Sequence, residues 1–198
     1  MNRIVAAPTA LVVALGAVVV VSGCSRAPAP AAAPAAAAAN SPYKPTATFQ
    51  EIMDSVVDPA GDYIWKAVAT TVDAKGSHET RPQTPAEWHE FRRHAVLLVE
   101  AANLIAVPGR RVAYGSKTVE DGGPLEVDKI QHRLDTQHDA LVGFAGALRD
   151  IGVKLLDDAD RQDSAAVTEH GGTLDEVCEA CHKVFWYPDE PKPANGGK

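Results

Sequence analysis

The chain has 198 residues with 26 acidic and 19 basic side chains, so its net charge at neutral pH is −7. This length accommodates one ordinary domain. An acidic chain without a basic stripe does not suit nucleic acids or anionic lipid surfaces, so we expect no nucleic-acid partner.

The first 23 residues have the pattern of an export signal. Arg3 precedes an apolar run from about Ile4 to Val21, and two small residues then precede Cys24. A charged start, an apolar run and a small-residue cleavage site are typical of such signals. The alternatives are a permanent membrane anchor, although no stop-transfer cluster of Lys or Arg follows, and an ordinary signal followed by a chance cysteine.

The sequence Val21-Ser22-Gly23-Cys24 resembles the lipobox of bacterial lipoproteins. This resemblance implies cleavage before Cys24, acylation of its thiol and anchoring on the periplasmic side of a bacterial membrane. Ser25 in the next position favours the outer membrane over the inner one. Residues 24–45 are then the acylated cysteine and a linker rich in Ala and Pro, which has almost nothing to bury.

We expect a folded domain at residues 46–190 and a flexible tail at 191–198. Strand patterns are missing, and helical patterns are abundant. The first helical segment covers residues 48–73, with apolar periodicity through Met53, Val57, Ile64 and Val68. Pro59 lies inside this segment, so we expect a kink or a restart there.

Two longer helices are predicted next. Thr84-Pro85-Ala86-Glu87 is a capping box with proline in the first helical position, and Pro108-Gly109 ends that segment. Its apolar residues recur every three or four positions: Trp88, Phe91, Ala95, Leu98, Ala102 and Ile105. A longer stripe, broken only by Gln137, follows at Val127, Ile130, Leu134, Leu141, Phe144, Leu148, Ile151 and Leu155. Such stripes are typical of helices that pack in a bundle.

A fourth helix is predicted from about Arg161 to Trp186, so we expect an all-α fold. Gly171-Gly172 indicates either a break, with a new helix capped by Thr173, or a place where something flat lies against the backbone. Its apolar face contains Val167, Leu174, Val177 and Cys181.

Cys178, Cys181 and His182 share one face of this last helix, within one turn. A redox dithiol or disulfide of this spacing usually accompanies a βαβ pattern, which is missing here. Zinc would need more ligands at similar spacing. The other histidines form no such pair: His78, His89, His94, His132, His138 and His170.

Cys-x-x-Cys-His is the signature of c-type haem attachment. The two thiols add across the vinyl groups of the porphyrin, and the adjacent imidazole coordinates the iron. Export agrees with this chemistry, since c-type haem is attached outside the cytoplasm. The motif therefore predicts one covalent haem c on Cys178 and Cys181, with His182 as the proximal iron ligand.

A helical domain with one such motif on its last helix resembles the class II c-type cytochromes, the cytochrome c′ group. The resemblance covers about residues 46–187 and implies an up-down-up-down four-helix bundle, of which cytochrome c′ is a standard example. In this family the first helix supplies the residue at the sixth iron position, which implies Met53 as the distal ligand. The alternative is a core methionine. Trp186 stands where cytochromes c′ usually carry Arg or Lys, which argues against a gas-binding role.

The predicted function is therefore that of a lipid-anchored periplasmic cytochrome, not an enzyme, that passes single electrons to redox partners. His–Met ligation suits electron transfer, whereas His alone leaves the iron open to gases. The first alternative is an NO- or CO-binding haem protein in which Met53 is displaced or uncoordinated. The second is a peroxidase, but the first helix offers no His or Arg near Met53. The resemblance also implies a possible homodimer through the first two helices, whose surface the kink at Pro59 would alter.

Overall fold

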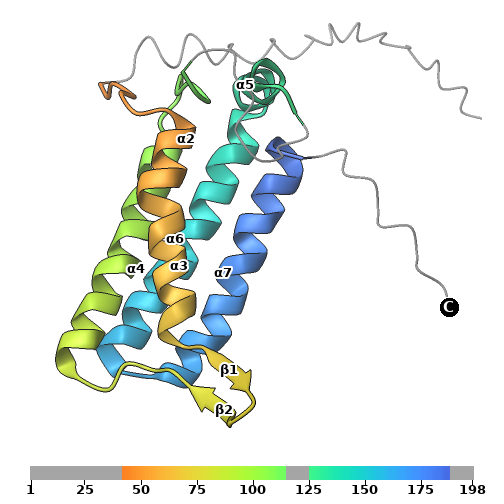
Figure 1. Ribbon diagram of the computed structural model, residues 1–198. Helices are drawn as coiled ribbons and strands as arrows, with labels where there is room; N and C mark the ends of the chain where they lie inside the picture. Colours follow the sequence, from red (N-terminus) through yellow and green to blue (C-terminus); the bar gives the residue numbers. More distant parts are fainter. Residues whose placement is uncertain (1–41, 115–124, 188–198) are drawn as a thin grey trace, which may run out of the picture. The chain divides into compact units, whose positions relative to one another are not determined.

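The computed structural model describes residues 42–114 and 125–187 (Figure 1). The expected signal sequence, Cys24, most of the linker and the tail at 191–198 lie outside these residues. Of the described residues, 71% are helical, and they contain one small two-stranded sheet. The described part of the chain is therefore predominantly α-helical, which is compatible with the expected all-α class.

The first helical segment has three consecutive parts. These are α2 (Phe49–Ile52), a π-helical turn η1 (Met53–Val57) and α3 (Asp58–Ala67). A capping box begins the segment, because the Thr48 hydroxyl accepts from the Glu51 N–H at 3.1 Å while the Glu51 carboxylate accepts from the Thr48 N–H at 2.8 Å. The irregularity that we expected at Pro59 therefore takes the form of a π turn directly before α3.

A β-hairpin follows, and here the expectation of a strand-free domain is wrong. Strands β1 (Thr70–Asp73) and β2 (Gly76–Glu79) pair antiparallel. Every residue of both strands is exposed, so there is no buried face and no apolar alternation that would reveal a strand in the sequence. The chain reverses where the Lys75 N–H donates to the Asp73 carboxylate at 2.7 Å and Gly76 adopts a φ of 128°.

Helix α4 (Pro85–Ile105) begins and ends where its sequence signals predict. The Thr84 hydroxyl accepts from the Glu87 N–H at 3.2 Å, and the Glu87 carboxylate accepts from the Thr84 N–H at 2.9 Å. All six predicted apolar positions are buried: Trp88, Phe91, Ala95, Leu98, Ala102 and Ile105.

The long apolar stripe after residue 126 forms two helices and not the single helix that we expected. Helix α5 (Val127–Thr136) and helix α6 (His138–Arg161) meet at Gln137, whose backbone is not helical. The Thr136 hydroxyl donates to the His132 carbonyl at 2.7 Å, a local bond that competes with helix continuation. Figure 1 shows α5 running in a different direction from α6.

Helix α7 (Ser164–Phe185) is continuous through Gly171 and Gly172, so the glycine pair does not break it. The Asp163 carboxylate caps its start by accepting from the Ala166 N–H at 3.0 Å. Helix α6 packs against α4 and α7, and α3 also packs against α4 and α7, so the four lie side by side (Figure 1). Large side chains fill the space between them: Ile64, Phe91, Leu98, Leu155 and Leu174. Each contributes about 1.5–3 kcal/mol through burial.

Candidate cofactor site

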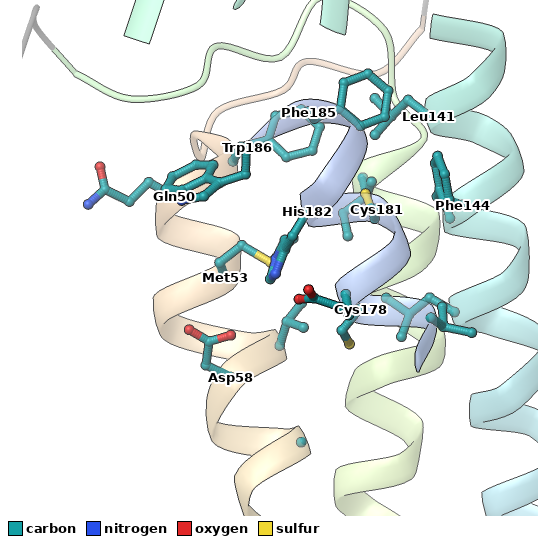
Figure 2. A pocket seen from close by; sticks show the side chains of 18 of the residues that line it. Gln50, Met53, Asp58, Leu141, Phe144, Cys178, Cys181, His182, Phe185 and Trp186 are labelled. Carbon is teal, nitrogen blue, oxygen red and sulfur yellow. The ribbon is translucent and has the colours of Figure 1, made fainter. Parts of the chain in front are cut away.

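A cavity of about 470 Å³ lies among the helices (Figure 2). Residues of α2, η1, α3, α4, α5, α6 and α7 line it, and most of their side chains are apolar. The lining also contains four carboxylates and one imidazole: Asp54, Asp58, Asp175, Glu179 and His182. A large pocket with apolar walls and a few polar groups is the usual form of a cofactor site.

The three residues of the Cys-x-x-Cys-His motif line this cavity from the last turns of α7. Cys178, Cys181 and His182 are half-buried, and both cysteines carry free thiols. Helical spacing presents two sulfur atoms and one imidazole on the same wall (Figure 2). This donor set fits a c-type haem, which needs all three groups on one side of the macrocycle.

Met53 lines the same cavity from η1, and its side chain points toward His182 in Figure 2. The fold thus brings together a thioether and an imidazole that are far apart in the sequence. Met53 is half-buried and also packs against the core, so the arrangement has features of both an axial ligand and a core methionine.

Burial keeps both thiols protonated at neutral pH. It raises the pKa of Cys178 to about 11, with smaller contributions from the charges of Asp175 and Asp58. It raises the pKa of Cys181 to about 12, with a smaller contribution from Cys178. Reactive dithiols have lowered pKa values, so these shifts argue against a redox dithiol.

Zinc ligands were a further alternative for the motif. Within residues 42–114 and 125–187, no group of three or more His, Cys, Asp or Glu side chains is placed to hold a metal ion. None of the six other histidines lines the cavity. Three of them have partners elsewhere: His94 stacks on Tyr63 at 3.9 Å, His170 contacts the buried Asp158 carboxylate at 2.6 Å, and His78 contacts Asp73 at 3.2 Å.

The carboxylates beside His182 give this end of the cavity a negative charge. Burial raises the pKa of the Asp58 carboxyl, and the charge of Asp54 raises it further, while His182 lowers it. A positive charge in the cavity would therefore be stabilised by Asp58 and its acidic neighbours.

The C-terminal turn of α7 closes one end of the cavity with aromatic rings. Phe185 meets Phe144 edge to face at 6.1 Å, and Tyr187 meets His182 edge to face at 6.0 Å. The Tyr187 hydroxyl also donates to the Glu179 carboxylate. Trp186 lines the cavity here as well.

Sequence reasoning missed the residues that line the cavity farther along α3. Gly61 and Trp65 lie on its wall, and the Trp65 indole reaches across to α7. Their spacing of four residues on one helix was the available signal, but that spacing does not reveal which partner they face.

Comparison with models of known protein families, with curated proteins and with solved structures gives no match. Among the residues that the structure describes, no helix combines the length and the apolar character needed to cross a membrane.

Proposed function

We propose that the chain is a monohaem c-type cytochrome that transfers single electrons. The observation that carries this proposal is the position of the Cys-x-x-Cys-His motif. Its thiols and imidazole line a large cavity with apolar walls, and the Met53 thioether points toward His182. The side-by-side packing of α3, α4, α6 and α7 supports a four-helix bundle with the haem on its last helix.

Each residue of the site has a role in this proposal. Cys178 and Cys181 hold the haem through thioether bonds, and His182 and Met53 are the iron ligands. The bound haem supplies a one-electron ferric/ferrous couple. The apolar walls keep water from the iron, and the nearby carboxylates stabilise the more positive, oxidised state. By the resemblance of Cys24 to a lipoprotein acylation site, the domain is anchored at the periplasmic side of a membrane.

The first test is covalency. Haem should remain with the protein during acid–acetone extraction, because thioether bonds do not dissociate. Replacing both Cys178 and Cys181 with Ser should let all haem pass into the organic phase. The c-type proposal fails if wild-type haem is extracted.

The second test concerns Met53, because it separates an electron carrier from a gas-binding protein. With a thioether ligand, the oxidised protein should be low-spin and show a weak sulfur-to-iron charge-transfer band in the far red. Met53→Ala should lose the band, become high-spin and bind carbon monoxide faster. Val56→Ala, at a half-buried position of the same turn, should change none of these properties. A wild type that is already high-spin and binds carbon monoxide rapidly would favour the gas-binding alternative.

A further inference from the structure

The helical turn that contains Met53 is one residue longer than an α-helical turn. The Asp58 N–H donates to the Met53 carbonyl, five residues earlier, whereas the Ile52 N–H donates to the Thr48 carbonyl, four residues earlier. A π turn of this kind inserts one extra residue into an otherwise α-helical segment.

The burial pattern on the two sides of the turn requires this extra residue. Phe49 and Ile52 are buried before it, and Val57, Ala60 and Ile64 are buried after it. An α-helix rotates by ~100° per residue. In a straight α-helix, the side chains buried before the turn and those buried after it would therefore point in directions that differ by roughly the rotation of one residue. The π turn absorbs that difference, so both sets face the same core.

The π turn also determines which side chain lies one helical turn before Asp58 on the face of the helix that lines the cavity. Asp58, Gly61 and Trp65 form a column on α3, and all three line the cavity. In a straight α-helix the next member of this column, four residues before Asp58, would be Asp54. In the π register the residue five positions before Asp58 takes that place. That residue is Met53.

Pro59 supplies a physical reason for the irregularity. Proline has no N–H, and in a straight helix its ring would collide with the Ser55 carbonyl four residues earlier. In the structure the π turn ends at Val57, and Pro59 occupies the first turn of α3, where proline is well tolerated.

We propose that this π turn, maintained by Pro59, is the device that turns the Met53 thioether toward His182. Pro59 is a positioning residue that acts through Met53. Without the π turn, the Asp54 carboxylate would lie one helical turn before Asp58, in the position that the Met53 thioether occupies. Met53 would then rotate toward the core. The inference rests on the proposed function only for the ligand role of Met53.

The register itself can be measured without reference to iron. In the NMR spectrum of the full protein, the Met53 Hα should show a nuclear Overhauser effect to the Asp58 amide proton. A contact from Met53 Hα to the Val57 amide without the Asp58 contact would indicate a straight α-helix and overturn the inference. If the Asp58 contact is present but the far-red thioether band is missing, the positioning is supported and the ligand role in the proposed function fails.

Deletion of Ser55 is the sharper test, because the two registers predict opposite results. Ser55 is exposed within η1. In a protein that also carries Pro59→Ala, so that no proline ring collides with the carbonyl four residues earlier, the deletion converts the wild-type π turn into a regular α-helix in which Met53 lies four residues before Asp58, and the far-red band should be retained. If the wild-type helix were straight, the deletion would rotate Met53 away by ~100° and abolish the band. Loss of the band in a folded variant therefore overturns the inference.

Two further variants keep the inference testable if the Ser55 deletion variant does not fold. Deletion of the exposed Asp62, within regular α3, is the matched control and should abolish the band because no extra residue is present there. The exchange variant Met53→Asp/Asp54→Met keeps the chain length and composition, and it should abolish the band because the methionine leaves the column. An exchange variant with an unchanged band would overturn the inference.

Discussion

The indole N–H of Trp65 donates a hydrogen bond to the carbonyl oxygen of Gly171 at 2.9 Å, and it thereby joins α3 to α7 beside the cavity. A Cβ on Gly171 would lie 3.6 Å from the indole Cδ1 atom. The flat group that lies against Gly171 is therefore the Trp65 indole, a side chain of the protein itself. The glycines do not break α7.

Replacing Trp65 with Phe should lower the free energy of unfolding by about 0.5–1.5 kcal/mol, because the hydrogen bond that joins the two helices is lost while the Gly171 carbonyl keeps its place in the helical hydrogen-bond pattern of α7. Chemical denaturation monitored by circular dichroism measures the change. Val72→Ala, on the exposed hairpin, should stay within about 0.5 kcal/mol of wild type. If the Trp65→Phe variant is as stable as wild type, the hydrogen bond does not join the helices.

Two helical glycines should respond to alanine in opposite directions. Nothing lies within 4 Å of a Cβ on Gly172, so Gly172→Ala should raise the free energy of unfolding by about 0.5–1 kcal/mol through helix propensity. On Gly152 a Cβ would lie only 2.8 Å from the Val99 Cγ2 atom, between α6 and α4. Gly152→Ala should therefore lower the free energy of unfolding by about 1–3 kcal/mol. Thermal and denaturant unfolding of both variants would reveal the contrast, and equal effects would contradict it.

The raised pKa of Asp58 predicts a pH-dependent effect on stability. Between its unfolded and folded pKa values the folded state binds more protons, so this group makes stability fall as pH rises through that window. Asp58→Asn should therefore be more stable than wild type at neutral pH, and the gain should disappear below pH of about 4.

The control for this pH effect is Asp150→Asn, because Asp150 is exposed and paired with Arg149 at 2.8 Å. Urea unfolding at several pH values measures both variants. A stability difference between Asp58→Asn and wild type that is the same at pH 3 and pH 7 would show that its cause is not titration.

Replacing Cys24 with Ser should release the protein from the membrane fraction and leave haem attachment intact. Acylation would supply the membrane affinity, and the Ala/Pro-rich linker has none. Fractionation of cells followed by haem staining measures both properties, and Ser25→Ala, which keeps the thiol, should remain with membranes. A Cys24→Ser protein that sediments with membranes would indicate that the apolar segment itself is the anchor.

The sequence by itself determined the features that depend on neighbouring residues. The capping box at Thr84 and the buried stripe of α4 follow from spacings of three and four residues, which local hydrogen bonds and helical geometry dictate. The placement of Cys178, Cys181 and His182 on one helical face is equally local, because it needs only one continuous turn.

Only the tertiary structure decided the features that depend on distant contacts. The α-helical pattern predicted that Met53 and Val57 lie on the same helical face. Because residues at both ends of η1 are buried against the same core, the helix contains a π turn instead, and this turn changes the direction of Met53 relative to Val57. The partner of Gly171 could not be found from the sequence either, because Trp65 lies on another helix, and helix packing alone determines which faces meet.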